Sequence, residues 1–394
     1  MNSLNRILTT HVGSLIRPPQ LTDYIRAIES GIIVDEEEFD ACLARCVVDV
    51  VRRQSEVGID LVSDGEFGKF RSWSWYIIDR LAGFEERSPV SPDGTPRPGS
   101  LRALTTHEAR LFPEFYAEYF DKQGFSFRGM PVCVGRIRYK GHLALRRDID
   151  HLKAALQEVR VVGAFMPVVA PGSAMPVYGD EFYNDEQQFL FALADAMHEE
   201  YRTIVDAGFL LQVDDAFLPF MWDMAFYEQG LEKYRQWARL RIEALNRALE
   251  GIPREKVRYH ICWGSFNTPH VCDVPLRDIV DLVLGVNCGA YCIEMANPRH
   301  EHEWRLWREV KLPQGCTLIP GVISHATNVV EHPELVAERL VRLAEIVGRE
   351  RVMGGTDCGF AQAPHVRRVH PTIMWAKLQA LAQGAQLASQ KLWG

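Results

Sequence analysis

His260 and Cys262, a histidine and a cysteine two residues apart, are the residues whose types and spacing point most directly to chemistry. Side chains at positions i and i+2 of a β-strand lie on one face, so the imidazole and the thiol can reach one ion. Such a pair alone also fits a core histidine beside a buried cysteine. Glu294 and Cys358, from two other predicted strand ends, complete a nitrogen, sulfur and oxygen donor set that suits zinc.

Short apolar runs alternate with long amphipathic segments along the chain, which is typical of repeated βα units. Eight runs are predicted barrel strands, at residues 8–14, 60–64, 165–170, 210–214, 257–262, 291–295, 318–322 and 352–357. Helices are predicted between them, at residues 37–57, 186–207, 229–249, 277–284 and 333–347. The pattern predicts an α/β protein folded as a (β/α)8 TIM barrel, with residues 1–394 forming a single catalytic domain.

One connection is much longer than the others. Residues 67–160 separate the second and third predicted strands, where roughly two to six loop residues are usual. Residues 88–100 are rich in Pro, Gly and Ser and are predicted to form an exposed loop. Residues 125–141 are predicted to form two strands around a Gly129-Met130-Pro131 turn. We therefore expect residues 67–160 to form an insertion subdomain with a hairpin over one end of the barrel.

Polar residues gather where the predicted strands end, and TIM-barrel active sites are built from these C-terminal ends. The residues in question are Ser14, Asp64, Glu66, Asp214, Asp215, His260, Cys262, Glu294, His325, Asp357 and Cys358. The pattern predicts that these side chains meet around one mouth of the barrel.

The composition excludes several classes of protein. The 394 residues include 52 acidic and 44 basic ones, and the net charge of −8 argues against a nucleic-acid partner. The sequence shows neither the roughly 18-residue apolar run of a membrane span nor the apolar core of a signal peptide. Nine cysteines, an odd number in so large a chain, argue against a disulfide framework. We expect a cytoplasmic protein, and an oligomer is compatible with the sequence.

Seven motifs carry a resemblance to a known family; in chain order they are TTHVGS, GIDLVSDGEFGK, LLQVDD, YHICWG, CIEMANPRHEHEW, LIPGV and MGGTDCGF. Together they resemble the catalytic barrel of cobalamin-independent methionine synthase over roughly the whole chain. The likeness corresponds to the C-terminal half of the long enzymes and implies that His260, Cys262, Glu294 and Cys358 are zinc ligands. DRLAGFEE and NPRHEHEW look closer to short stand-alone members, which include the epoxyalkane:coenzyme M transferases.

The resemblance also implies roles for substrate-binding residues. Ser14, Glu66 and Asp214 fall on positions that hold homocysteine in methionine synthase, the carboxylates meeting its ammonium. The family's Asp-Glu-Pro-Ala after the fourth strand reads DDAF here, from Asp214 onward, and this departure bears on whether the substrate is an amino acid. Capping or ion pairing is the alternative reading of Glu66 and Asp214.

Histidines supply candidates for proton transfer. The family's Asp-Ile-His-Ser after the seventh strand reads SHAT here, with His325 offset by one position. His325 suits a general acid, because a near-neutral pKa suits that work, but a structural loop histidine fits equally. His302 is a second candidate proton donor, and His11 is a further candidate for facing the pocket.

The segment RHEH, residues 299–302, follows the sixth predicted strand directly. Arg299 and His300 are candidates for binding the far end of the substrate, and an ion-paired loop that closes the barrel rim is the alternative. Trp73, Trp75 and Tyr76 fit an aromatic wall for a flat or apolar donor, or packing within the insertion.

The sequence therefore predicts a zinc-dependent methyl or alkyl transferase that activates a thiol substrate as a zinc-bound thiolate. Its partners would be a small-molecule thiol and an alkyl donor, with methyltetrahydrofolate or a methylcorrinoid as candidate methyl donors. Thiol addition to an epoxide, or the reverse C–S cleavage, is an alternative with the same metal chemistry. A metal-free barrel that resembles uroporphyrinogen decarboxylase is a third reading.

Overall fold

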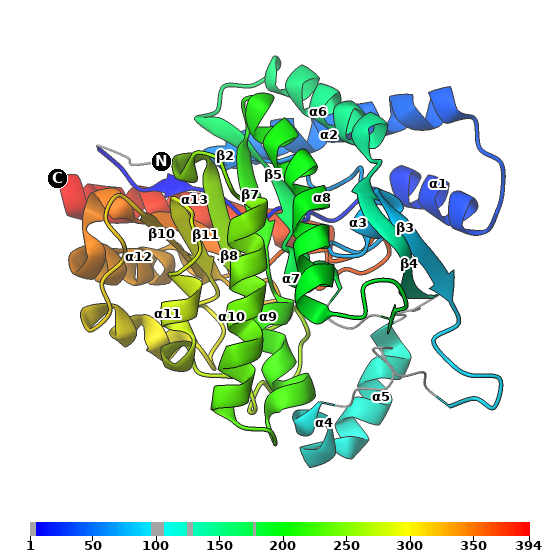
Figure 1. Cartoon of the computed structure of the whole chain (residues 1–394). Coiled ribbons are helices and arrows are strands. Elements are labelled where there is room, and N and C mark those ends of the chain that lie inside the picture. Colours follow the sequence, from blue (N-terminus) through cyan, green and yellow to red (C-terminus); the bar gives the residue numbers. More distant parts are fainter. Residues whose placement is uncertain (1–4, 96–105, 124–128, 176–178) are drawn as a thin grey trace.

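Eight parallel strands form a nearly closed barrel in the computed structural model, which describes residues 5–95, 106–123, 129–175 and 179–394 (Figure 1). They are β1 (Leu8–Thr9), β2 (Leu61–Val62), β5 (Gly163–Val169), β7 (Leu210–Asp214), β8 (Val257–Ile261), β9 (Ala290–Ile293), β10 (Thr317–Ile323) and β11 (Met353–Thr356). The order β1-β11-β10-β9-β8-β7-β5-β2 leaves β1 and β2 at the edges, and the Asp60 amide donates to the Thr9 carbonyl across that gap. Each predicted barrel strand is confirmed.

Amphipathic helices cover the outside of the barrel, as Figure 1 shows for α8 and α10. The long ones are α1 (Pro19–Glu29), α2 (Glu36–Glu56), α8 (Glu186–Asp206), α10 (Leu231–Ala248), α12 (Pro333–Val347) and α13 (Pro371–Trp393). The acidic run at residues 35–38 starts α2, because the Asp35 carboxylate accepts from the amides of Glu37 and Glu38. The helix predicted at 277–284 is instead a 3-10 turn (Leu276–Asp278) followed by the short α11 (Val280–Val283).

Shorter elements complete the chain. The α-helical turns are α7 (Pro171–Ala174) and α9 (Phe217–Met221), and a π-helical turn, η2 (Trp222–Phe226), follows α9. The 3-10 turns other than η4 (Leu276–Asp278) are η3 (Arg254–Lys256), η5 (Glu301–Arg308) and η6 (Arg349–Arg351). In the part of the chain that the structure describes, no helix has the length and apolarity needed to cross a membrane.

The connection between β2 and β5 contains an antiparallel pair, but its strands differ from those predicted. They are β3 (Leu81–Arg87) and β4 (Met130–Tyr139), and β6 (Gly179–Asp180) adds to the other side of β4. The predicted Gly129-Met130-Pro131 turn is wrong, because Met130 and Pro131 lie within β4; residues 125–128 lie outside the described residues. β6 covers only Val132 and Cys133, so the proline does not interrupt a ladder on that side.

Helices make up the rest of this connection: α3 (Tyr76–Asp79), α4 (His107–Leu111), α5 (Pro113–Gln123) and α6 (His142–Leu156). α6 packs on α2 and so contributes to the outer helix layer. α4 and α5 lie below and apart from the helix layer in Figure 1 and contact loops of the barrel mouth. The Val271 amide, after β8, donates to the Glu108 carboxylate of α4 at 2.5 Å, and the Asn267 amide donates to the Tyr119 hydroxyl of α5 at 2.8 Å.

A buried ion-pair network fastens the insertion to the barrel. Arg80 donates to Asp148 of α6 at 2.5 Å and to Glu200 of α8 at 3.1 Å. Glu200 also accepts from the hydroxyls of Tyr76 at 2.9 Å and Tyr139 at 2.7 Å. The network therefore joins α3, β4, α6 and α8, with every charge in it compensated or hydrogen-bonded.

Candidate metal centre at the barrel mouth

Three predicted ligands converge at the C-terminal ends of the strands. His260 lies in β8, Cys262 follows β8 directly, and Cys358 lies two residues beyond β11. One ligand atom from each lies within 4.8 Å of the other two, and the two sulfur atoms are 3.4 Å apart. All three side chains are buried. The barrel thus brings together donors that are up to 98 residues apart in sequence (358 − 260).

The chemistry of this donor set fits a zinc ion. Neither ring nitrogen of His260 has a hydrogen-bond partner among the described residues, although the side chain is only 2% exposed. Burial, with a contribution from the Arg258 charge, lowers the pKa of His260 to about 3, so the imidazole is in its neutral, metal-binding form. Two thiolates 3.4 Å apart would repel one another unless a cation lay between them. One nitrogen and two sulfur atoms match the donors that zinc prefers.

Glu294, the fourth predicted ligand, lies beside this group but is held by other contacts. Its carboxylate accepts from the Trp263 amide at 3.0 Å and from the Asn297 side-chain amide at 3.0 Å. The pKa of the Cys262 thiol is raised well above its ordinary value, first by the Cys358 thiol, then by burial and by the Glu294 charge. Since the Glu294 charge acts on this thiol, Glu294 lies close to the sulfurs. The structure thus groups three donors tightly and leaves the fourth side chain hydrogen-bonded next to them.

Asp357, which precedes Cys358 at the end of β11, is hydrogen-bonded to the backbone that follows Glu294 at the end of β9. Its Oδ1 accepts from the amides of Met295 at 2.9 Å and Ala296 at 2.7 Å. A Cβ atom on Gly321 would lie 2.1 Å from this oxygen, so β10 needs glycine at the point of closest approach. Asp357 therefore positions neighbouring residues and does not belong to the tight donor group.

The acidic residues predicted to bind substrate lie together after β2 and β7. Glu66 accepts from Lys69 at 3.0 Å, and Asp214 accepts from Gln212 at 2.8 Å. Burial, followed by the Glu66 charge, raises the pKa of Asp214 well above its ordinary value, so the two carboxylates are near one another. Asp215 instead accepts from Ser173 and Tyr259 and has a structural position.

Ser14 lies against the residues that follow Cys358. A Cβ atom on Gly359 would lie 1.9 Å from the Ser14 hydroxyl oxygen, and the Phe360 amide donates to the Ser14 carbonyl at 2.8 Å. The structure thus places Ser14 next to the segment that carries a sulfur donor.

His325 is buried near the candidate metal centre and is unusual in its surroundings. Neither ring nitrogen has a partner within the described part of the chain. Burial, with the Arg368 charge as the next cause and His260 as a smaller one, lowers the pKa of His325 to about 3. A backbone contact at Ser265 acts in the opposite direction but makes no well-formed hydrogen bond. A buried histidine with such weakly engaged nitrogens fits a role in substrate contact or proton transfer better than a packing role.

The other predicted histidines lie elsewhere. The Nε2 of His11 lies 2.7 Å from Gln54 of α2, and its Nδ1 accepts from the Gly13 amide at 3.1 Å. Both nitrogens of His11 are therefore engaged on the helix side of β1. His302 is exposed on η5. The structure does not bring His11 or His302 together with the metal donors.

Arg299 and His300 belong to an ion-paired loop, which was the alternative reading of this segment. Arg299 is exposed and donates to the carbonyls of His270 at 3.1 Å and Val271 at 3.4 Å. His300 is buried; its Nδ1 lies 2.9 Å from Glu303 and its Nε2 lies 2.9 Å from Asp273. The geometry gives both residues contacts within the rim and places neither among the donors.

Asp273 lies between two histidines in what we call the histidine–carboxylate cluster, formed by His270, Asp273, His300 and Glu303. The Nδ1 of His270 lies 2.7 Å from the same Asp273 oxygen that His300 contacts. Burial opposes protonation, but hydrogen bonds to the carboxylates raise the pKa of His270 to about 9 and that of His300 to about 10. The His300 ring also stacks on Trp263 at 3.8 Å, so the cluster supports the segment between Cys262 and Glu294. His270 and Asp273 carried no sequence signal, because their partner His300 is remote in sequence.

This cluster predicts a pH-dependent stability. His300 gains protonation on folding, so its stabilisation is fully present below pH 6.5 and is lost as pH rises toward about 10. Between these limits the free energy of unfolding of the metal-free protein should fall by roughly a few kcal/mol. In His300→Gln this fall should be smaller, because only His270 then keeps a raised pKa, whereas His302→Gln, an exposed neighbour, should keep the full fall. Urea unfolding at stepped pH measures this, and equal slopes for all three proteins would contradict the assignment.

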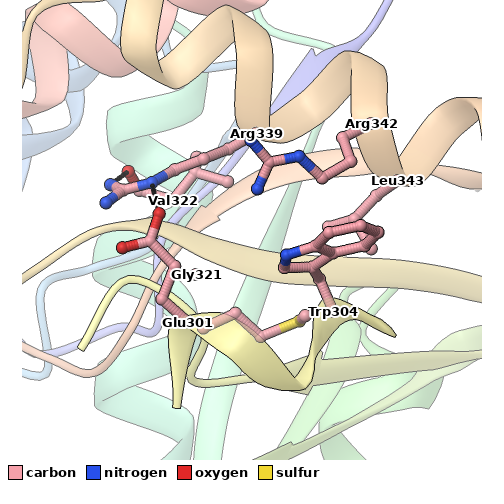
Figure 2. A pocket seen from close by; sticks show the side chains of 8 residues that line it. Glu301, Trp304, Gly321, Val322, Arg339, Arg342 and Leu343 are labelled. Atoms are coloured by element: carbon pink, nitrogen blue, oxygen red, sulfur yellow. Dashed lines mark hydrogen bonds and ion pairs between the residues drawn. The ribbon is translucent and has the colours of Figure 1, made fainter. Parts of the chain in front are cut away.

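A surface pocket lies apart from this centre, between β10, η5 and α12 (Figure 2). Its lining residues border about 240 Å³ of empty space, part of which is open solvent. Arg339 crosses one side, donating to Glu301 at 2.9 Å and to the Val322 carbonyl at 3.0 Å, while Trp304 and Arg342 form the other side. Glu301, part of the predicted RHEH segment, is thus tied to α12.

The fold and donor set define a TIM-barrel protein with a candidate metal centre at the C-terminal strand ends. No protein-family model matches the chain. The chain is 24% identical to a methionine synthase from Sulfolobus acidocaldarius, over 98% of this chain and 93% of that protein. It is similarly 24% identical to a methionine synthase from Sulfurisphaera tokodaii, over 100% and 95%, and 23% identical to the YxjH protein of Bacillus subtilis, over 94% and 91%.

Solved structures show the same fold. A B12-independent methionine synthase from Shewanella sp. W3-18-1, in complex with selenomethionine, superposes with a TM-score of 0.70 at 19% identity, covering 98% of this chain and 99% of that one. A Listeria monocytogenes structure covers 100% of both chains with a TM-score of 0.66. These findings confirm the predicted resemblance: the chain is similar over 98–100% of its length to proteins named methionine synthase and shares the fold of solved B12-independent methionine synthase structures.

Proposed function

We propose that this protein is a zinc-dependent methyltransferase whose acceptor is a small-molecule thiol. The observation that carries the proposal is the convergence of a neutral, unpartnered His260 with Cys262 and Cys358 within 4.8 Å. Three protein donors with a further position left for exchange is the arrangement of catalytic zinc sites. The full-length similarity to proteins named methionine synthase supports transfer of a methyl group.

Zinc would be held by His260, Cys262 and Cys358, with Glu294 as an exchangeable fourth ligand. When bound, the ion lowers the pKa of a coordinated thiol so that the nucleophilic thiolate is present at neutral pH. Glu294 is suited to exchange because its carboxylate already has alternative partners in the Trp263 and Asn297 amide groups. The two cysteines keep the sulfur of the acceptor electron-rich.

The remaining residues act on the substrates directly. Ser14, Glu66 and Asp214 would hold the end of the thiol that lies away from sulfur, and a buried acidic pair favours a cationic group there. His325 is neutral, so it can take the proton that the incoming thiol releases and return it to the departing donor. The complex of the Shewanella enzyme with selenomethionine, the selenium analogue of methionine, supports homocysteine as the first thiol to test.

The proposal predicts that metal removal abolishes methyl transfer. Protein dialysed against a chelator should lose activity by at least about 100-fold, and one equivalent of zinc per chain should restore it, because thiol activation depends on the ion. In the assay, the zinc-loaded protein is mixed with homocysteine or a simple thiol and with one of three donors: isotope-labelled methyltetrahydrofolate, a labelled methylcorrinoid or an epoxide. The mass of the product identifies the group that is transferred to sulfur. Full activity in the zinc-free protein would overturn the proposal, and a hydroxyalkyl thioether as the sole product would replace methyl transfer by epoxide opening.

A further inference from the structure

Glu66 has an unusual backbone conformation. Its φ is +62°, in the left-handed region that residues with a side chain rarely adopt, and Gly65 before it has a φ of +69°. A glutamate stays in this region only where the surrounding structure outweighs its local preference, and such residues gather at functional sites. The turn that carries Glu66 is therefore held in place by its neighbours.

The side chains of Arg17 and Asp64 hold the backbone of this turn. The Arg17 Nη2 donates to the Glu66 carbonyl at 2.5 Å and to the Lys69 carbonyl at 2.8 Å. The Asp64 carboxylate accepts from the Glu66 amide at 2.9 Å. Both backbone polar groups of Glu66 are thus bound by side chains. Arg17 also fixes Glu66 relative to Lys69, whose ammonium donates to the Glu66 carboxylate at 3.0 Å.

Arg17 is a buried cation that links two strand ends. It is 6% exposed and lies between β1 and α1, so its hydrogen bonds tie the mouth end of β1 to the turn after β2. Burial lowers the pKa of Arg17 to about 10 against the opposing effect of the Glu66 and Asp64 charges, so the guanidinium keeps its charge at neutral pH. An apolar side chain of similar length has no donor for the two carbonyl groups.

The Glu66 carboxylate lies against a segment that reaches the metal donors. A Cβ atom on Gly13 would lie 2.8 Å from the Glu66 Oε1, and Gly13 directly precedes Ser14. The Ser14 hydroxyl packs in turn against Gly359, the residue after Cys358. Close contacts thus connect the Glu66 carboxylate to a sulfur donor, and a shift of the turn would move this carboxylate relative to the metal centre.

We propose that Arg17 is a positioning residue that holds Glu66 in its left-handed conformation and so directs the Glu66 carboxylate at the ammonium group of an amino-acid thiol. This inference rests on the proposed function, because it uses Glu66 as a group that meets the substrate. Arg17 acts only through the carbonyl groups of Glu66 and Lys69. Binding of a thiol that lacks an ammonium group should therefore not depend on Arg17.

The test compares two thiols on cobalt-loaded protein, where a bound thiolate gives a charge-transfer absorption band. Homocysteine and 4-mercaptobutanoate differ only in the amino group. The native protein should bind homocysteine about ten- to hundredfold more tightly, the value expected for a charged hydrogen bond. Arg17→Met should reduce this ratio to about threefold or less, while the dissociation constant of 4-mercaptobutanoate stays within about threefold of the native value.

Three further variants show whether Arg17 acts through Glu66. Glu66→Gln should lose the same preference. Arg17→Met combined with Glu66→Gln should lose no more than Glu66→Gln alone, because effects that pass through one residue are not additive. Arg17→Lys keeps the charge, so it should fold even where Arg17→Met does not. Its preference should be intermediate, since an ammonium group does not reproduce the geometry of a planar guanidinium.

Arg351→Met is the matched control. Arg351 also donates to backbone carbonyls, those of Cys316 at 3.0 Å and Pro313 at 2.7 Å, but at the N-terminal ends of the strands. This variant should keep the full preference for homocysteine. A full preference in either single Arg17 variant, a further loss in the double variant, or no preference in the native protein would overturn the inference alone. If no thiol changes the cobalt spectrum, the proposed function fails as well.

Discussion

Replacing Cys358 with serine is expected to lower the affinity for zinc by at least about 100-fold and to reduce methyl transfer at least as much. Even the loss of a hydrogen bond to a metal ligand costs roughly 10- to 100-fold in affinity, and here a sulfur donor itself is lost. The serine hydroxyl stays protonated at neutral pH and cannot supply the charge that a thiolate gives. The Cys262 sulfur, 3.4 Å away, would lose its partner across the ion.

Zinc content after dialysis against a graded chelator series measures this effect directly. Cys133→Ser is the matched control, because Cys133 is buried like Cys358 but lies in β4, with its sulfur 3.4 Å from the Gly135 carbonyl. A serine hydroxyl can make the same contact, so the control should keep one zinc per chain. If Cys358→Ser and Cys133→Ser retain zinc equally, Cys358 is not a ligand.

Replacing Arg80 with methionine should lower the free energy of unfolding more than any other substitution proposed for this protein. Arg80 is 6% exposed and compensates two buried carboxylates, Asp148 and Glu200, on different helices. Removing one partner of a buried ion pair leaves an uncompensated charge and typically costs about 3–5 kcal/mol. The network also holds Tyr76, whose ring lies 4.3 Å from the Lys69 ammonium. Because Lys69 donates to Glu66, the loss of Arg80 should also make the positions of Glu66 and Asp214 less well defined.

Urea unfolding provides the measurement for this variant, with the midpoint and the free energy of unfolding compared across proteins. Arg202→Met is the control, since Arg202 pairs with Asp206 at 3.5 Å but both side chains are more than 60% exposed. An exposed pair of this kind is worth about 0–1 kcal/mol. Similar losses for Arg80→Met and Arg202→Met would show that the buried network contributes little.

The barrel itself could be predicted from sequence because its signals are local. The runs that became β5 and β10 are almost continuously apolar, as parallel strands buried on both faces must be. Polar residues at the ends of most of the predicted strands then marked the mouth. The spacing of His260 and Cys262 put both side chains on one strand face, and their ligand atoms lie within 4.8 Å of that of Cys358 in the structure.

Contacts between remote loops could not be predicted in the same way. His270 and His300 meet at one carboxylate of Asp273, and no periodicity links the loops that carry them. The rings of Trp73 and Phe217 likewise stack with centroids 5.7 Å apart, although the two residues are 144 positions apart in sequence (217 − 73). The positions of such side chains follow from how the barrel closes, which a local pattern does not encode.

The insertion shows a related limit. The Gly-Met-Pro segment has the composition of a turn, yet Met130 and Pro131 pair with Arg87 and Glu86 across the β3–β4 ladder. β3 was missed because its sequence, LAGFEER, is mixed in polarity and is partly exposed. Tertiary pairing therefore outweighed local turn preference here.

X-ray absorption at the zinc edge of the loaded protein tests the central claim most directly. A centre built from His260, Cys262 and Cys358 predicts two sulfur scatterers at about 2.3 Å and a nitrogen or oxygen shell at about 2.0–2.2 Å. Addition of homocysteine should raise the sulfur count toward three and lower the light-atom count. A zinc spectrum with only nitrogen and oxygen scatterers, or a protein that binds no zinc, would contradict the account.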